Sequence, residues 1–203
     1  MNYLLPLIAV ILGYILALVI QPKKKSNLKL LLAFSGSFLL SVTVISLLPE
    51  VYETKNTTIG LYIMLGILFQ IILEFFSKGA EHGHVHGHQT ITHIPWLLFI
   101  SLCIHALLEG FPVGHHHDLS IGIAIHHLPI AIILTTFFVQ AQLNKKAIFA
   151  FMITFAMMTP LGTLASNYIP GLQEYTTEIT AIVIGILFHI SSTFIFESSE
   201  GHK

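Results

Sequence analysis

The chain alternates between long apolar stretches and short polar breaks. A helix needs about 20 mostly apolar residues to cross the hydrocarbon core of a bilayer. Seven stretches have this character, and they cover residues 3–20, 28–48, 59–76, 94–113, 119–139, 147–166 and 179–196. The pattern predicts an all-α integral membrane protein, a polytopic helical bundle built as one transmembrane domain over residues 1–203. The third break is rich in histidine and predicts a loop over residues 77–93.

The lysines predict how the chain is oriented, because cytoplasmic loops of membrane proteins carry an excess of basic residues. If the N-terminus lies outside, the inner segments hold eight lysines and the outer segments hold only Lys55. We therefore expect an outside N-terminus and a cytoplasmic loop at 77–93. The start of the chain shows no targeting extension, which favours a bacterial inner (cell) membrane and leaves organelle membranes as the alternative.

The composition narrows the classes of function. Only 9% of the 203 residues are charged, against about 25% in soluble domains, which argues against a soluble globular enzyme. The net charge of −1 and the absence of arginine argue against nucleic-acid binding. A single cysteine excludes an intrachain disulfide and a cysteine-rich metal site. The 13 histidines are the unusual feature and point to imidazole chemistry.

Two neighbouring apolar stretches contain ionisable residues that predict a metal site inside the membrane. His105 and Glu109 are four residues apart, so they share one helical face. His126 and His127 lie in the next stretch, followed by Pro129. Such groups are costly in a bilayer and need partners, and imidazole with carboxylate suits Zn²⁺, Fe²⁺ and similar ions. The alternative is a buried Glu–His pair that only braces the bundle.

Four further polar residues lie within the predicted spans. Gln70 and Glu74 share a face of the third span, where Glu74 either lines a pathway or anchors the helix at the inner interface. His189, among hydroxyl side chains, is either a pathway residue or a satisfied core group. Ser46 either belongs to a polar strip along a conduit or allows close helix packing.

Two clusters of histidines lie between the spans, one on each side of the membrane. The inner cluster is His82, His84, His86 and His88, and the outer cluster is His115, His116, His117 and Asp118. Closely spaced imidazoles on flexible segments can collect metal ions, whereas the alternative is that both are plain polar loops. Metal-collecting loops on both sides of an intramembrane metal site indicate passage of the ion rather than its storage.

Several motifs of the chain resemble those of the ZIP (zinc/iron-regulated-like) family of divalent-metal transporters. Residues 105–110 form a His-x-x-x-Glu-Gly motif in the fourth span, and His126 precedes Pro129 in the fifth. Residues 48–50 form Leu-Pro-Glu, and residues 159–162 form Thr-Pro-Leu-Gly. With the histidine-rich loop after the third span, the resemblance covers nearly the whole chain.

The resemblance implies a function and a ligand set. Members of the family move Zn²⁺ or related ions (Fe²⁺, Mn²⁺, Co²⁺) toward the cytoplasm, use elevator-like alternating access, and commonly form homodimers. The matching ligands here are His105, Glu109 and His126. Ala106 and Ile130 stand where many members have Asn and Glu, which implies one metal ion rather than two, with His127 as a substitute ligand. The family has eight spans, so an eighth span is expected beyond the seven visible here.

Two other functions compete with transport. The first is an intramembrane zinc-dependent hydrolase, in which a metal-bound water is the nucleophile. Asp118 is the only aspartate and lies in a loop, which disfavours this enzyme. The second is a membrane metal sensor without flux. The chain has no phosphate-binding loop of the GxxxxGK[ST] type, so we expect no organic cofactor and transport driven by ion gradients.

Overall fold

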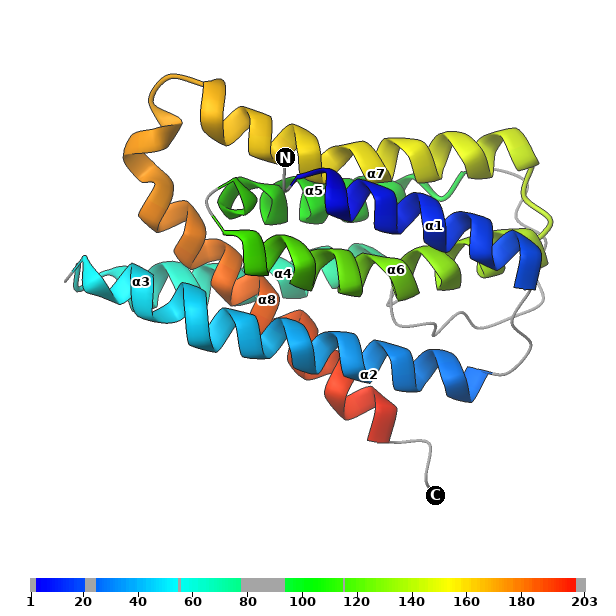
Figure 1. Ribbon diagram of the computed structural model, residues 1–203, viewed down its shortest axis with the longest axis horizontal. Coiled ribbons are helices and arrows are strands. Elements are labelled where there is room, and N and C mark those ends of the chain that lie inside the picture. Colours follow the sequence, from blue (N-terminus) through cyan, green and yellow to red (C-terminus); the bar gives the residue numbers. More distant parts are fainter. Residues whose placement is uncertain (1–2, 21–24, 55, 78–93, 115, 200–203) are drawn as a thin grey trace.

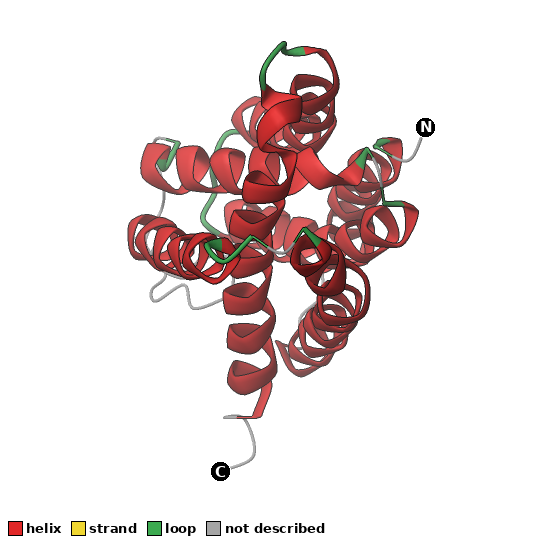
Figure 2. Cartoon of the chain, turned by 90° about the vertical axis from the view of Figure 1, so that its left-hand side faces the viewer, coloured by secondary structure: helices red, strands yellow, loops and turns green. Residues whose placement is uncertain are grey.

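The computed structural model describes residues 3–20, 25–54, 56–77, 94–114 and 116–199. This part of the chain is helical and contains no strand (Figure 2). The helices are α1 (Leu4–Ile20), α2 (Lys25–Val42), α3 (Leu48–Glu53), α4 (Ile59–Ser77), α5 (Trp96–Val113), α6 (His117–Gln140), α7 (Lys145–Tyr168) and α8 (Thr176–Ser199). A π-helical turn, η1 (Thr43–Leu47), joins α2 to α3, and a 3₁₀ turn, η3 (Leu172–Tyr175), precedes α8.

The lengths of these helices fit a polytopic membrane protein. Six helical segments are long and apolar enough to cross a bilayer, and α1 is a shorter apolar helix of 17 residues. At a rise of 1.5 Å per residue, α1 is about 26 Å long, close to the thickness of the hydrocarbon core. The prediction of an all-α polytopic helical membrane protein is confirmed.

The second membrane segment continues past the point where the sequence pattern predicts its end. Residue 48 was the expected end, because Pro49 and Glu50 open a polar stretch, but the helix runs on through α3 to Glu53. The N–H of Leu48 donates to the carbonyl of Thr43, five residues back, as in a π-helix. Pro49 then lies in the first turn of α3, where its missing N–H costs little. Glu50 thereby lies within the continued helix, near its C-terminal end.

Three helix pairs with extensive contacts organise the bundle. These pairs are α1 with α6, α4 with α8, and α5 with α7. The α2 helix packs against both α6 and α8. Figure 1 shows α8 running obliquely past α2 and α4. The fold therefore brings together segments that are far apart in the sequence.

Glycines allow two of these pairs to approach closely. On α4 and α8, Gly66 and Gly185 face each other, and a Cβ on Gly66 would collide with the carbonyl oxygen of Ile182. On α5 and α7, Gly110 and Gly162 meet in the same way. Small residues at helix crossings let backbones pack in a membrane, where the hydrophobic effect contributes little to association. The second crossing fixes the part of α5 that carries Glu109.

We predict that Gly66→Ala lowers the thermal stability of the detergent-purified protein. The added methyl group must separate α4 from α8, and overpacking of this kind costs about 1–3 kcal/mol. Gly60→Ala is the matched control on α4, because its Cβ would meet only the Tyr52 hydroxyl, at 3.7 Å. Thermal unfolding followed by circular dichroism compares the two variants. Equal midpoints for both variants would contradict the close crossing.

The outward faces of several helices are apolar and suited to contact lipid. On α4, exposed side chains include Leu61, Met64, Leu68, Ile72 and Phe75. The interior is also largely apolar, with Phe138, Phe151, Phe155 and Phe194 among its largest buried side chains. Buried ionisable residues are concentrated on α5 and α6. A polar cluster enclosed by apolar surroundings is therefore the feature that requires a functional explanation.

Candidate metal centre

The first half of the centre comes from α5. Nε2 of His105 lies 3.2 Å from Oε1 of Glu109, one helical turn away, and both side chains are buried, at 1% and 0% exposure. Gly110 follows directly and packs against α7, where the hydroxyl of Thr163 donates to the Gly110 carbonyl over 2.7 Å. Glu109 is therefore next to a close contact between α5 and α7.

The second half of the centre comes from α6, where two adjacent histidines point to different neighbours. The ring of His126 packs against Phe194 of α8, and the ring of His127 packs against Phe155 of α7. Both histidines are buried. Pro129 lies inside α6 two residues later, and proline interrupts helical hydrogen bonding to the carbonyl four residues before it. Helix α6 is therefore locally weakened next to the two histidines.

The carboxylate of Glu109 lies between two imidazoles. Oε1 contacts His105, as above, and Oε2 lies 3.0 Å from Nε2 of His127. A buried carboxylate is costly unless its oxygens are paired, so the two histidines stabilise Glu109 inside the bundle. Nδ1 of His127 has no hydrogen-bond partner among the described residues. The carboxylate is thus held in a defined position between α5 and α6.

Three of these side chains are spaced closely enough to hold one metal ion. His105, Glu109 and His126 each offer a ligand atom, and the three atoms lie within 4.8 Å of one another. Zn²⁺ bonds nitrogen and oxygen at about 2.0–2.2 Å, which places neighbouring ligands of a tetrahedral site about 3.4 Å apart. Small side-chain shifts would therefore close the cluster around an ion. The resulting set of two nitrogens and one oxygen leaves one tetrahedral position open.

The structure brings His105, Glu109 and His126 into one cluster, and His127 contacts Glu109 at its edge. Through this contact, His127 positions the carboxylate of Glu109, in addition to its predicted role as a substitute ligand. That any of these residues binds metal stays a prediction. The spacing of His105 and Glu109 in the sequence signals a shared face, but only the packing of α5 against α6 brings the two halves together.

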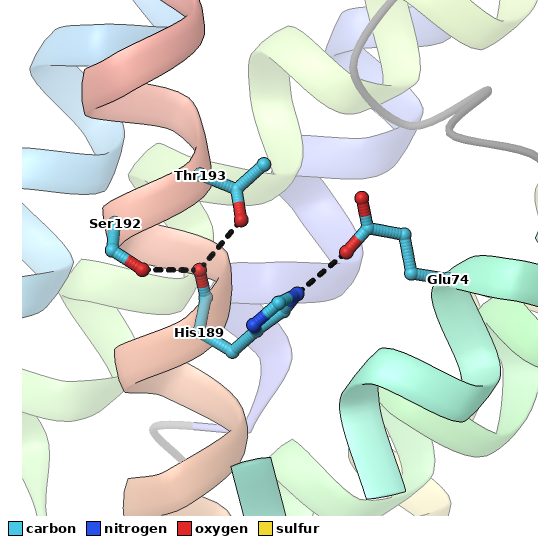
Figure 3. Close-up of polar contacts among 4 residues, drawn as sticks. All are labelled: Glu74, His189, Ser192 and Thr193. Carbon is cyan, nitrogen blue, oxygen red and sulfur yellow. Dashed lines mark hydrogen bonds and ion pairs between the residues drawn. The ribbon is translucent and has the colours of Figure 1, made fainter. Parts of the chain in front are cut away.

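A second histidine–carboxylate pair joins α4 to α8 (Figure 3). Nε2 of His189 on α8 is 2.5 Å from Oε2 of Glu74 on α4, and both side chains are partly exposed. The hydroxyls of Ser192 and Thr193 donate to the backbone carbonyl of His189 over 2.8 and 2.9 Å. The sequence identifies both residues but not their pairing, which follows from the α4–α8 crossing.

The remaining pathway candidates lie in different surroundings. Gln70 is buried on α4, one turn before Glu74, and its Oε1 has no hydrogen-bond partner in the part of the chain that the structure describes. Ser46 is half-buried in η1, on a different helix. Their roles along a pathway stay predictions.

The predicted outer histidine cluster is divided by the structure. His116 directly precedes α6, and its Nε2 lies 3.2 Å from Oε2 of Glu50 on α3. His117 and Asp118 open α6 and are exposed, with Nδ1 and Oδ1 3.9 Å apart. His115 lies outside the described residues, as do His82, His84, His86 and His88 of the inner loop. The sequence pattern did not predict the contact between His116 and Glu50.

The chain is similar to several curated proteins over part of its length. It is 27% identical to Protein zntD of Dictyostelium discoideum, over 59% of this chain and 20% of that protein. It is 25% identical to Zinc transporter ZIP1 of Danio rerio, over 42% and 36% respectively. Identity to Zinc transporter ZIP9 of Micropogonias undulatus is 24%, over 71% of this chain and 50% of the relative.

The chain thus spans between a fifth and half of the length of these relatives. No family model matches the sequence, and no solved structure matches it. The chain therefore resembles ZIP-type zinc transporters, at low sequence identity.

Proposed function

We propose that the protein is a ZIP-like transporter of divalent metal ions, with Zn²⁺ as its main cargo, and that the ion passes through the centre formed by α5 and α6. The observation that carries this proposal is the buried group of His105, Glu109 and His126, whose ligand atoms lie within 4.8 Å of one another. The similarity to proteins named as zinc transporters supports the choice of cargo.

The donor set suits a cargo that must be released again. Structural zinc sites are closed by four protein ligands, whereas three ligands leave a position for water. The carboxylate of Glu109 also has an alternative partner, because its Oε2 contacts His127. An ion that leaves the centre therefore does not leave behind an unpaired buried carboxylate. This exchange of partners lowers the free-energy cost of the centre without a bound ion. It therefore favours passage of the ion over its storage.

The centre is suited to one ion. The resemblance to the ZIP family implies that Ala106 and Ile130 occupy the positions where many members carry polar groups of a two-metal site, and both are buried at 0% and 1% exposure. Neither side chain offers a ligand atom. Imidazole and carboxylate ligands accept Zn²⁺, Fe²⁺, Mn²⁺ and Co²⁺, so the donor set alone permits all four ions. We propose Zn²⁺ as the preferred ion because of the named relatives.

Hydrolysis is less well supported than transport. Two of the relatives are named as zinc transporters, which supports the prediction that the chain is not an enzyme. Asp118, the only aspartate in the sequence, is exposed at the start of α6. Eight residues of helix separate it from His126, which corresponds to about 12 Å along the axis. A general acid at that distance would not reach a water molecule on the metal.

The direction of transport and the assembly are further parts of the proposal. The excess of lysines on one side supports an outside N-terminus, and the resemblance to the ZIP family supports uptake toward the cytoplasm and a homodimer.

Flux of ⁶⁵Zn²⁺ into proteoliposomes tests the proposed function. Purified protein should accelerate zinc entry well above that of protein-free liposomes, and unlabelled Zn²⁺ should compete better than Fe²⁺, Mn²⁺ or Co²⁺. Mg²⁺ and Ca²⁺, which prefer sites built from oxygen atoms alone, should not compete. Zinc binding without flux would instead favour the metal sensor.

Labelling from outside the cell tests the proposed orientation. In a Cys103→Ser background, a cysteine replacing Thr57 between α3 and α4 should react with a membrane-impermeant maleimide in intact cells. A cysteine replacing Gln142 between α6 and α7 should react only after the membrane is opened. Both native side chains are exposed, so accessibility within the protein is matched. The reverse pattern would show that the N-terminus lies inside.

A further inference from the structure

At the outer end of the bundle, a carboxylate and an imidazole from distant segments meet. Oε2 of Glu50 and Nε2 of His116 are 3.2 Å apart, close to the spacing of about 3.4 Å for neighbouring ligands of a tetrahedral zinc ion. Glu50 is about half exposed, at 53%, and His116 is 19% exposed. Solvent therefore reaches this pair directly, unlike the buried centre.

The backbone around His116 holds the imidazole in position. The N–H of His116 donates to the carbonyl of Val113 at the end of α5, and its own carbonyl accepts from the N–H of Ser120 in the first turn of α6. Glu50 lies in the first turn of α3. The π-helical turn η1 precedes α3, so the helix continues through Pro49. The imidazole thus comes from the residue that caps α6, and the carboxylate comes from the first turn of α3.

A pocket adjoins Glu50 and provides room for water molecules next to its side chain. It has a volume of about 320 Å³ and is lined by Glu50, Val51, Glu53, Thr54, Thr176, Thr177 and Thr180. Its polar lining consists of carboxylates and hydroxyls, which offer oxygen atoms to a hydrated cation. A divalent ion bound to Glu50 would therefore have solvent and further oxygen atoms nearby.

We propose that Glu50 and His116 form an outer capture site, which binds Zn²⁺ from solution before the ion reaches the buried centre. The inference rests on the proposed transport function and deepens it by naming the first site at which the ion binds. Two protein ligands completed by water bind more weakly and exchange faster than the three ligands of the centre. Helix α6 connects the outer capture site to the buried centre, because His116 precedes His126 by ten residues, about 15 Å along the helix axis.

Zinc-dependent uptake should distinguish a capture site from a structural contact. Glu50→Gln and His116→Gln should each raise the KM for zinc by about three- to tenfold and leave the maximal flux within twofold. The double variant should resemble the single variants, because either change removes the same site. Glu174→Gln, an exposed carboxylate in η3, is the matched control and should leave both parameters unchanged. A proportional loss of flux at every zinc concentration would overturn the capture site and indicate a simple latch between α3 and α6.

A second experiment tests zinc binding at the pair without relying on transport. Diethylpyrocarbonate modifies accessible histidines, and peptide mass spectrometry reports each one separately. In full-length Glu109→Ala protein, in which the centre is disabled, Zn²⁺ should slow modification of His116 more than that of exposed His117. Adding Glu50→Gln should remove this protection.

The two experiments separate failure of the capture site from failure of the proposed function. Protection of His116 in a protein without zinc flux would support the site and contradict transport. Flux without protection, or protection that persists in Glu50→Gln, would overturn the capture site.

Discussion

Replacing Glu109 with glutamine is expected to reduce zinc flux by at least about 100-fold. The amide has nearly the same shape as the carboxylate, but it carries no charge and is a poor zinc ligand. Loss of groups that merely orient a ligand costs about 10–100-fold in metal affinity, so loss of the ligand itself should cost more. The two contacts of Glu109, with His105 and His127, are also weakened when the charge is removed.

Glu174→Gln serves as the matched control for this experiment, since it makes the same chemical change at an exposed position in η3. Flux is measured in proteoliposomes with equal amounts of each protein, after size-exclusion chromatography has shown that both are folded. If the Glu109→Gln variant retains more than about half of the flux, the assignment of Glu109 as a metal ligand is contradicted.

His126→Ala is the second substitution with a large expected effect. The imidazole of His126 is the contribution of α6 to the group of three ligand atoms. Without it, the group keeps only the two ligands of α5, His105 and Glu109. We expect zinc flux to fall by at least about tenfold, on the same grounds of ligand loss.

The neighbouring substitution His127→Gln separates two roles for His127. If this imidazole only holds Oε2 of Glu109, the glutamine amide can replace the hydrogen bond, and flux should fall by less than in His126→Ala. If His127 is itself a ligand, the two variants should lose flux equally. The comparison uses initial rates of ⁶⁵Zn²⁺ entry over a range of zinc concentrations. A His126→Ala protein with unchanged flux would contradict the assignment of His126.

Much of the fold could be predicted because the physical signal is local. Each membrane span is a continuous apolar stretch, so its existence and type are readable without knowledge of its neighbours. The pairing of His105 with Glu109 is also local, because four residues correspond to about one helical turn. The end of the second span was harder to predict, since Pro49 and Glu50 resemble a helix end. The π-helical turn at Thr43–Leu47 accommodates the proline and prolongs the helix.

Contacts between helices could not be predicted in the same way. Helical periodicity reports which residues share a face, but it does not report which face of another helix lies opposite. Glu74 and His189 were therefore recognised separately, although their side chains meet where α4 packs against α8. The contact of Glu50 with His116 is a similar case, because it joins the end of α3 to the start of α6. Glycines such as Gly66 and Gly185 mark these crossings only after the partner helix is known.

The position of the metal ion itself tests the central claim most directly. Crystals of the protein soaked in zinc can be measured at the zinc absorption edge, where anomalous difference density identifies the ion and its location. We predict a peak within about 2.0–2.2 Å of ligand atoms from His105, Glu109 and His126. Zinc peaks found only elsewhere in the molecule, with none between α5 and α6, would contradict the proposed centre.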